Sequence, residues 1–395
     1  MHSYPTIHGY SIFAERSIKF LGNMLTSVSK PGFPNWNEVT SASKLIGEHV
    51  TLPTGSQVLY MNSGNGIGGV YLAKKFPDSS LHMMDTNVVA LESIEKTIAA
   101  NSLPNIHVIP WSAKGLPDSD YDVVILEIIK GRKITRRFIL EAFSALRIGG
   151  NFYLAGGNQL GIHSLIGDAR NVFGNASLQG YKKGHRICLY EKATSGISHT
   201  EWSSEPGITP GSWYEFHTLM SNSPVTIRSI PGVFSYDKID PGTWLLLQNL
   251  RIQPGQRVLD LGCGWGCIGI DASLKGAQVE MVDVDLLAYY SADQNIRSAN
   301  LKTASVYASD ITSRIPNRTY QIVLSNPPFH AGAQVDYTVA EAIVSQAYNV
   351  VESGGEIWLT ANQFLTYQDY LTKYFGNSNI VAVTRGYKIL RAIKV

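Results

Sequence analysis

Asn326 and the two prolines after it are the residues with the clearest chemical use in this sequence. They follow the run Tyr320-Gln321-Ile322-Val323-Leu324-Ser325, whose apolar and β-branched residues predict a buried strand. Proline donates no hydrogen bond to a sheet, so Pro327 and Pro328 end this strand and fix the loop. The Asn326 side chain and the adjacent carbonyl oxygens should then lie at the carboxyl end of a strand, where open α/β sheets bind their ligands.

Two hydrogen-bond acceptors beside the flat ring of Phe329 suit a planar group that carries an –NH2. We therefore predict that Asn326, Pro327, Pro328 and Phe329 form the catalytic site of an amino-group methyltransferase. The Asn326 side-chain oxygen and the Pro327 carbonyl would accept the two amino protons and so localise the nitrogen lone pair. The alternative interpretation is an ordinary Pro-Pro turn after a core strand.

A glycine-rich turn supplies the second candidate site. Gly264-Trp265-Gly266-Cys267-Ile268-Gly269 fits the pattern G-x-G-x-x-G after a strand, and Asp283 or Asp285 follows at the spacing of a ribose-binding carboxylate. Taken alone, this pattern predicts a dinucleotide site. Asp260 changes the prediction, because a carboxylate there would repel a pyrophosphate and attract the ammonium group of S-adenosylmethionine. The Asn-Pro-Pro-Phe segment also has no role in hydride transfer.

The residues that we expect to bind S-adenosyl-L-methionine follow from their positions. Glycines in the turn permit close approach of the backbone to the cofactor, Asp283 should bind the ribose hydroxyls, and Asp310 could accept a hydrogen bond from the adenine amino group. For each aspartate the alternative is a helix N-cap or a loop carboxylate. The predicted residues are Asp260, Gly262, Cys263, Gly264, Gly266, Asp283 and Asp310.

The chain contains a domain-sized repeat, because six blocks recur in the same order; Val58 and Val258, for example, are 200 positions apart (258 − 58). The paired blocks are 57–66 with 257–266, 82–85 with 280–283, 100–103 with 299–301, 121–125 with 320–324, 149–154 with 354–359, and 180–182 with 386–388. In each half, short apolar strands alternate with helix-length segments, which predicts a mostly parallel sheet covered on both faces. The expected fold is α/β, with two tandem Rossmann-like domains.

The two halves differ at the residues that should do chemistry. Tyr60 stands in place of Asp260, Asn62 in place of Gly262, and Glu127-Ile128-Ile129 in place of the Asn-Pro-Pro segment. We therefore predict a degenerate domain at 1–192, a linker at 193–229 and a catalytic domain at 230–395. Residues 1–50 read as a polar, partly helical lead-in, and 213–220 as a short helix within the linker.

Composition agrees with a two-domain globular protein: 395 residues, 44% hydrophobic and 16% charged. The net charge of +2 means that any nucleic-acid surface must be local. The three cysteines fit neither a disulfide framework nor a zinc pattern, so no metal is expected. No secretory signal is visible, and no apolar run approaches the roughly 20 residues that span a bilayer. We expect a cytoplasmic monomer without a membrane partner.

These motifs resemble a known family, the ribosomal RNA guanine-N2 methyltransferases (RsmC/RlmG-like, with a methyltransferase small domain). The resemblance covers essentially all of 225–395. It is carried by 258–266, Asp283, Asp310, 325–330, 231–235 and 240–243. It implies a degenerate N-terminal class I methyltransferase domain before an active one, S-adenosylmethionine as cofactor, and ribosomal RNA or a ribosomal subunit as partner. It also implies that Phe234 and 240–243 flank the cofactor. Trp265 departs from the family pattern, where a small residue is expected in the turn.

Two questions stay open at the level of the sequence. Asn-Pro-Pro-aromatic segments also occur in DNA adenine and protein glutamine methyltransferases, although His330 and the duplicated architecture favour the ribosomal RNA family. A non-catalytic RNA-binding scaffold is the alternative from another class. For the RNA surface, the densest basic cluster is Lys130-Gly131-Arg132-Lys133-Ile134-Thr135-Arg136-Arg137, which predicts either a phosphate-binding footprint or a solvated helix face.

Overall fold

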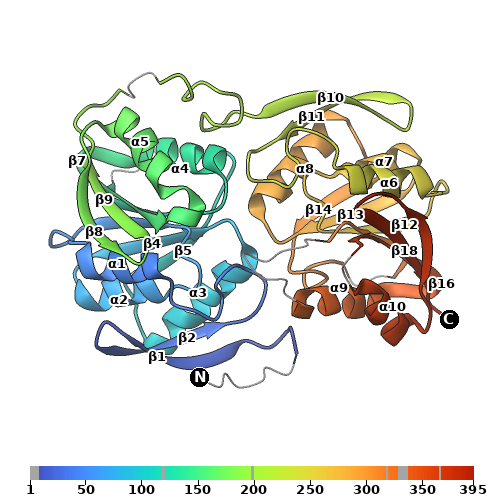
Figure 1. The fold of residues 1–395 in the computed structure, drawn as a ribbon, viewed down its shortest axis with the longest axis horizontal. Coiled ribbons are helices and arrows are strands. Elements are labelled where there is room, and N and C mark those ends of the chain that lie inside the picture. The colour runs from blue at the N-terminus through green and yellow to red at the C-terminus, as the bar shows by residue number, and fades with distance from the viewer. Residues whose placement is uncertain (1–8, 117–120, 197–199, 317–318, 328–336, 364–365) are drawn as a thin grey trace. The chain divides into compact units, whose positions relative to one another are not determined.

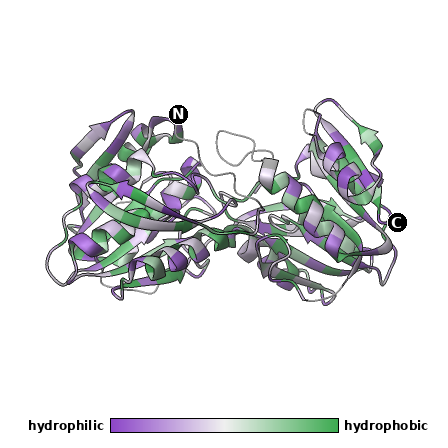
Figure 2. Cartoon of the chain, turned by 90° about the horizontal axis from the view of Figure 1, so that it is seen from below, coloured by the Kyte–Doolittle hydropathy of each residue, from purple (hydrophilic) through white to green (hydrophobic). Residues whose placement is uncertain are grey.

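The computed structural model describes residues 9–116, 121–196, 200–316, 319–327, 337–363 and 366–395. The chain forms two compact units, Met1–Trp213 and Tyr214–Val395 (Figure 1). Apolar residues concentrate along the central strands of the sheets, and polar residues on the outward parts of the helices (Figure 2). None of the helices in these described ranges is long and apolar enough to cross a membrane.

Unit 1 combines a β-hairpin with a larger mixed sheet. Its strands are β1 (Ala14–Phe20), β2 (Asn23–Ser29), β3 (Gln57–Met61), β4 (Ser80–Asp85), β5 (Ile106–Pro110), β6 (Tyr121–Glu127), β7 (Leu146–Gly157), β8 (Ser177–Lys182) and β9 (His185–Glu191). Its helices are α1 (Ser41–His49), α2 (Ile67–Lys75), α3 (Val88–Asn101), α4 (Arg132–Ala145), the short 3-10 helix η1 (Asn158–Leu160) and α5 (Ile162–Phe173). In the described part of the unit, seven strands lie in the order β5-β4-β3-β6-β7-β9-β8, and β9 runs antiparallel to both neighbours.

Unit 2 repeats this architecture. Its strands are β10 (Tyr214–Met220), β11 (Ser223–Ser229), β12 (Arg257–Leu261), β13 (Gln278–Asp283), β14 (Ala304–Ala308), β15 (Tyr320–Ser325), β16 (Val351–Asn362), β17 (Asn379–Val383) and β18 (Tyr387–Ile393). Its helices are α6 (Pro241–Asn249), α7 (Cys267–Leu274), α8 (Leu286–Ser298), α9 (Tyr337–Val350) and α10 (Tyr367–Phe375). The strand order over the described residues, β14-β13-β12-β15-β16-β18-β17, is that of unit 1 element by element. The predicted duplication of an α/β fold is confirmed.

One of the six repeated blocks was paired wrongly. The sequence interpretation matched 180–182 with 386–388, but Tyr181 lies on β8 and Tyr387 begins β18. The strand pairings give the true counterpart: Gly157 of β7 pairs with His185, and Asn362 of β16 pairs with Tyr387. His185 is therefore the unit 1 equivalent of Tyr387, because a three-residue likeness fixes register less firmly than a strand ladder does.

The segment 213–220 is not the short helix that we expected. Tyr214–Met220 is the strand β10, and it pairs in antiparallel register with β11. Its side chains alternate between more and less exposed positions, which is the two-residue period of a strand. The chain divides after Trp213, so this hairpin lies in unit 2 although the sequence interpretation counted it in the linker. The hairpin β1–β2 holds the same place in unit 1. It lies within residues 1–50, where the expected helical part is α1.

Arg137 holds residues 200–213, which belong to the expected linker, to the rest of unit 1. This arginine is fully buried and pairs with Glu141 one helical turn away, at 3.0 Å between Nε and Oε1. Its guanidinium also donates to the carbonyl oxygens of Gly207 and Ser212, at 3.1 and 3.0 Å. Glu141 accepts a second bond from Trp111 Nε1 at 3.0 Å, and burial raises the pKa of the Glu141 carboxyl. One buried ion pair therefore joins α4 to this segment.

We predict that Arg137→Ala destabilises unit 1 by about 3–5 kcal/mol, because it removes the ion-pair partner of the buried Glu141 carboxylate and the donor to three backbone carbonyls. Urea unfolding followed by fluorescence would measure the shift. Arg147→Ala is the matched control, since it breaks the exposed pair with Asp122 (2.6 Å) and should change the free energy of unfolding by less than about 1 kcal/mol. Equal effects of the two substitutions would contradict the structural role of the buried pair.

Candidate functional site

The Asn326 loop and the glycine turn begin side by side, at the carboxyl ends of two neighbouring inner strands of the unit 2 sheet. β12 and β15 are parallel neighbours, and Leu261 pairs with Ser325. Ser325 Oγ, which is buried, donates to the Leu261 carbonyl at 2.7 Å. Because Gly262 and Asn326 directly follow this pair, the two predicted motifs leave the sheet from adjacent carboxyl ends.

The glycine turn has the backbone that its composition predicts. Gly262, Gly264 and Gly266 have φ values of +72°, +57° and +95°, a region that other residues rarely adopt. The amides of Gly262 and Cys263 donate to the Val282 carbonyl at 2.9 and 3.0 Å. The Cys263 thiol is buried, and burial raises its pKa well above the ordinary value.

Asp283 holds the turn from the end of β13. Its Oδ2 accepts from Gly264 N at 2.9 Å and its Oδ1 from Asp285 N at 3.0 Å. Its carbonyl accepts from Ser309 N at 2.8 Å, which brings the buried Asp310, just beyond β14, to the same edge of the sheet. Burial raises the pKa of Asp283.

Asp85 makes the same bonds in unit 1. Its Oδ2 accepts from Gly64 N at 3.1 Å, and its Oδ1 accepts from Asn87 N at 3.0 Å. A carboxylate at this position therefore shapes the turn in both units, whatever else it binds.

Asp260 presents a buried oxygen that no described residue satisfies. Its side chain is fully buried on β12, and Oδ2 accepts from Gly269 N at 2.9 Å. Oδ1 accepts no hydrogen bond from any residue that the structure describes. Burial, reinforced by the nearby carboxylate of Asp283, raises the pKa of Asp260 to about 7. A buried acceptor of this kind is costly unless a ligand or solvent satisfies it.

Asn326 shows the same feature on the other side of the site. Its Nδ2 donates to Thr243 Oγ1 at 2.7 Å and to Asp240 Oδ2 at 3.2 Å. Its Oδ1 is buried and accepts nothing from the described part of the chain. The amide is therefore held by its nitrogen, and its oxygen is left to receive a donor.

The two partners of Asn326 belong to the first turn of α6. Asp240 is the N-cap of this helix, and its Oδ2 also accepts from Thr243 N at 3.0 Å. Tyr387 OH donates to Asp240 Oδ1 at 3.4 Å. A methyl group placed on Gly242 would lie 2.6 Å from Tyr387 Cδ1 and 2.8 Å from Thr360 Cγ2, so only glycine lets the helix lie this close to β16 and β18.

The Trp265 side chain packs outside the glycine turn, against Ser235 and Phe216. Its Nε1 donates to the Ser235 carbonyl at 3.1 Å, and its ring lies edge-on against Phe216 at 5.6 Å between centroids. The bulky residue thereby anchors the 231–235 loop against the glycine turn. Phe234, in that loop, is 58% exposed, and its carbonyl oxygen lies 4.0 Å from a methyl group placed on Gly264.

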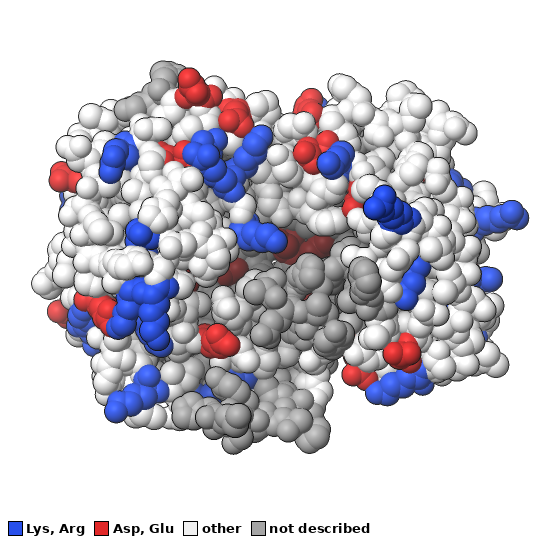
Figure 3. Space-filling view, in the orientation of Figure 1, with Lys and Arg blue, Asp and Glu red and all other residues white. Residues whose placement is uncertain are grey.

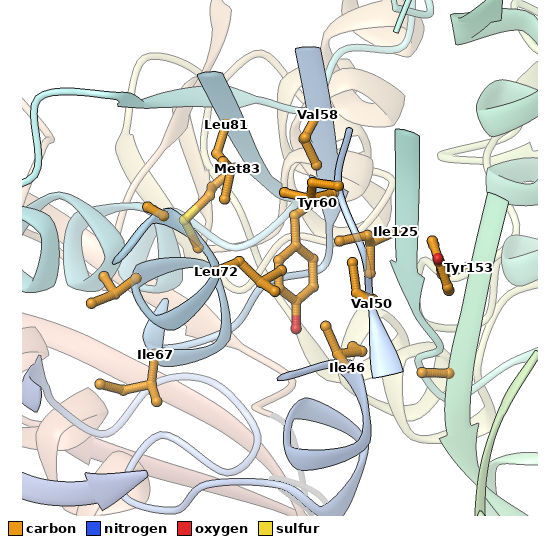
Figure 4. Packing of buried hydrophobic residues seen from close by; sticks show 14 of the residues in the cluster. Ile46, Val50, Val58, Tyr60, Ile67, Leu72, Leu81, Met83, Ile125 and Tyr153 are labelled. Atoms are coloured by element: carbon orange, nitrogen blue, oxygen red, sulfur yellow. The ribbon is translucent and has the colours of Figure 1, made fainter. Parts of the chain in front are cut away.

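Unit 1 fills the equivalent place with a closed network around Glu127. Its carboxylate accepts from Thr40 Oγ1 at 2.6 Å, Ser43 Oγ at 3.0 Å and Tyr60 OH at 3.0 Å. The ring of Tyr60 lies among buried apolar side chains of the unit 1 core (Figure 4). Burial raises the pKa of both Glu127 and Tyr60. Both Glu127 oxygens are satisfied within the protein, whereas Oδ1 of Asn326, at the equivalent position, has no donor among the described residues.

The basic cluster on α4 is largely neutralised. Arg132 and Arg136 both donate two hydrogen bonds to Asp168, at 2.7–3.0 Å. Lys133 pairs with Glu205 at 3.2 Å. On the face seen in Figure 3, acidic side chains are interspersed among basic ones over unit 1. Together with the burial of Arg137, this weighs against the predicted phosphate footprint, and the partner carboxylates lie too far away in sequence to have been foreseen.

Of the predicted catalytic residues, Asn326 and the buried Pro327 lie at the site. Pro328, Phe329 and also His330 lie outside the described residues. The predicted cofactor residues Asp260, Gly262, Cys263, Gly264, Gly266 and Asp283 come together around the turn, with Asp310 on the neighbouring strand end.

Comparison with known proteins settles the family. The sequence profile of the methyltransferase small domain matches residues 24–188 and 224–391, that is, most of both units. The chain belongs to the methyltransferase small-domain family. Two relatives, both called ribosomal RNA small subunit methyltransferase C, agree with this assignment. The protein from Psychromonas ingrahamii is 33% identical over 281 residues, covering 70% of this chain and 77% of the relative. The protein from Pseudomonas entomophila is 32% identical over 282 residues, covering 71% and 81%.

A solved structure extends the likeness to the whole methyltransferase chain. The 16S rRNA N2 G1207 methyltransferase (RsmC) of T. thermophilus, in complex with AdoMet and guanosine, matches with a TM-score of 0.81 and 26% identity. The match covers 98% of this chain and 99% of the other. The resemblance drawn from the sequence motifs, and the class I methyltransferase fold, are confirmed.

Sequence reasoning missed how this methyltransferase holds Asn326. It placed 240–243 beside the cofactor by resemblance, and it gave Tyr387 no role. The sequence does carry a signal for the local structure, since Asp240-Pro241 is a typical N-cap followed by proline at the first helical position. It carries none for the contact with Asn326, which lies 86 positions away.

We predict that Asp260→Asn changes how stability depends on pH. A carboxyl group whose pKa is about 7 when folded and near 4 when unfolded stabilises the fold below pH 4, and that stabilisation is lost as pH rises to about 7. Asparagine does not titrate, so the free energy of unfolding of the variant relative to wild type should increase by at least about 1 kcal/mol between pH 4.5 and pH 8. Urea unfolding over this range would measure it, and a difference independent of pH would contradict the burial argument.

Proposed function

We propose that this protein transfers a methyl group from S-adenosylmethionine to the exocyclic N2 amine of a guanine in small-subunit ribosomal RNA. The observation that carries the proposal is the buried Oδ1 of Asn326, which accepts no hydrogen bond from the described residues and is fixed as an acceptor beside the glycine turn. Membership of the methyltransferase small-domain family and the names of the relatives support the reaction and the RNA class.

The residues around the turn fit S-adenosylmethionine. Asp260 Oδ1 is a buried acceptor suited to a positively charged group, and the three left-handed glycines let a ligand approach the backbone closely. Asp283 and Asp310 would accept from the ribose hydroxyls and the adenine amino group, and Cys263 and Phe234 would flank them. Bound S-adenosylmethionine supplies an activated sulfonium methyl group.

The chain's own residues would prepare the nucleophile. The lone pair of guanine N2 is delocalised into the ring, and hydrogen bonds from its two protons to Asn326 Oδ1 and the Pro327 carbonyl would localise it. N2 would then gain the methyl carbon as the bond from that carbon to the sulfonium sulfur breaks, which leaves S-adenosylhomocysteine, and N2 would lose one proton. Asn326 is neutral and cannot take that proton, so it passes to water. Phe329 would stack on the base, a contact worth roughly 1–3 kcal/mol in single-strand binders, and a paired target would first be extruded.

The RNA partner is proposed on the same grounds. The T. thermophilus protein is named as a methyltransferase of N2 of G1207 in 16S rRNA. This chain would act on an equivalent guanine, in free RNA or in a ribosomal subunit. A ribosomal substrate would place the protein in the cytoplasm. The monomeric state stays a prediction.

Mass spectrometry of nucleosides tests the proposal. Ribosomal RNA from a strain that lacks the gene should lose one N2-methylguanosine, and purified protein with S-adenosylmethionine should restore it. Restoration of N6-methyladenosine in DNA, or methylation of a protein glutamine, would overturn the substrate assignment. Absence of S-adenosylmethionine binding in calorimetry would instead favour the non-catalytic scaffold.

We predict that Asn326→Ala lowers the rate of methyl transfer at least about 100-fold, because the amine loses the oxygen that positions it. The affinity for S-adenosylhomocysteine should change less than about threefold, since Asn326 is assigned to the nucleobase. Single-turnover methylation of RNA and calorimetry measure the two quantities. Pro53→Ala in unit 1 serves as a control for purification and handling. A fully active Asn326→Ala protein would refute the assigned chemistry.

A further inference from the structure

We propose that Asp240 is a positioning residue: it fixes which end of the Asn326 amide faces the substrate, and thereby makes the site select a nucleobase amine. This inference rests on the proposed function and adds to it the source of the selectivity. Asp240 is not itself placed against the reacting atoms. Its role is to act through Asn326.

The need for such a residue comes from the symmetry of an amide. The oxygen and the nitrogen of an asparagine side chain have nearly the same size, so shape alone does not decide their positions. One orientation presents an acceptor to the substrate and suits an amine. The other presents two N–H donors and suits a carbonyl. Neighbouring polar groups must therefore set the orientation.

Asp240 can do this because a carboxylate only accepts. Its Oδ2 lies 3.2 Å from the Asn326 amide and must face the N–H side. Thr243 Oγ1, at 2.7 Å, does not decide the matter alone, because a hydroxyl can either donate or accept. Asp240 and Thr243 are 8% and 5% exposed, so bulk water cannot readily replace either partner.

The Asp240 carboxylate is itself held rigidly. Thr243 N at the helix N-terminus donates to Oδ2 at 3.0 Å, and Tyr387 OH donates to Oδ1 at 3.4 Å. The close contact of Gly242 with the Tyr387 ring fixes the first turn of α6 against the sheet. The carboxylate that orients Asn326 is thus itself held by a backbone donor on a packed helix.

Unit 1 shows the same positions with the opposite polarity. Thr40 is the N-cap of α1 and Ser43 lies three residues on, as Asp240 and Thr243 do in α6. Both hydroxyls donate to Glu127, which occupies the place of Asn326. In unit 1 the N-cap Thr40 donates to Glu127 at the strand end. In unit 2 the N-cap Asp240 accepts from Asn326 at the strand end. The N-cap residue sets what the strand end presents.

The consequence concerns the group at C2 of a purine. With Asp240 in place, Asn326 Oδ1 accepts from the amine of guanosine, whereas inosine, which has hydrogen at C2, leaves this buried oxygen unpaired. An unpaired buried acceptor costs about 1–3 kcal/mol, or roughly a 5- to 150-fold difference in affinity. Without the carboxylate, the amide is free to turn and this preference disappears.

Asp240→Thr tests the proposal, because it retains a capping side chain and replaces the pure acceptor with a hydroxyl that can donate, as in unit 1. Calorimetry would measure guanosine and inosine binding in the presence of S-adenosylhomocysteine. Wild type should bind guanosine at least about fivefold more tightly than inosine. In the variant, assayed at a concentration of S-adenosylhomocysteine that saturates it, this ratio should fall to about one, and the rate of RNA methylation should fall at least tenfold.

Asp240→Asn is the conservative control. The amide of Thr243 requires an acceptor at the position of Oδ2, and that same oxygen serves Asn326, so this variant should keep the wild-type preference for guanosine. Rescue by asparagine separates orientation of the amide from capping of α6, which threonine also performs. Should Asp240→Thr fail to fold, Asp240→Ser carries the same hydroxyl on a stronger N-cap and is expected to give the same result.

The outcomes are distinct. If Asp240→Thr binds S-adenosylhomocysteine and still prefers guanosine as wild type does, Asp240 does not orient the amide, and the inference is wrong while the proposed function stands. If wild type itself binds guanosine and inosine equally, recognition of the amine by Asn326 fails, and the proposed function fails with it.

Discussion

The hydrogen bond from the Asn326 amide to the cap of α6 is the interaction on which the site depends. Buried polar groups in proteins are almost always satisfied, and here each of two side chains is satisfied on one atom only. Asn326 donates through its side-chain nitrogen to Asp240 and Thr243, and one oxygen of Asp260 accepts from Gly269 N. The oxygens left over are buried, one on β12 and the other directly after the neighbouring strand β15. Half-satisfied groups of this kind are a cost to folding that a ligand relieves, which is why they mark a binding site.

Unit 1 shows the same fold without the half-satisfied side chains of unit 2. Its strand order and the bonds that Asp85 makes to the turn are those of unit 2, and the turn keeps two of the three glycines, Gly64 and Gly66. Asp85 is kept because the turn needs a carboxylate to accept its amides. Tyr60 and Glu127, by contrast, are bonded to each other. The fold is therefore retained while the free acceptors are removed, and a likeness in topology alone would not distinguish a catalytic unit from a vestigial one.

Much of this organisation could be predicted from the sequence, because it depends on local rules. Strand periodicity, glycines at left-handed positions and prolines at a strand end located the turn and Asn326 correctly. What escaped prediction depends on contacts between distant residues: the bond of Asn326 to Asp240, and the neutralisation of α4 by Asp168 and Glu205. The strand β10 escaped for another reason, since its polar linker-like surroundings outweighed its own two-residue alternation.

The residues at four polar positions of the site depend on one another, so a residue of one unit cannot simply be exchanged for its counterpart in the other. Asp240, Thr243, Asp260 and Asn326 in unit 2 correspond to Thr40, Ser43, Tyr60 and Glu127 in unit 1. A glutamate in place of Asn326 would bring a second carboxylate to within hydrogen-bond distance of Asp240, where the amide now stands at 3.2 Å, and both would be buried. Burying two like charges side by side is unfavourable unless one takes up a proton. A change of polarity at the strand end therefore requires a change at the helix cap, and a unit that has changed both has exchanged an amide open to substrate for a carboxylate that the protein satisfies by itself.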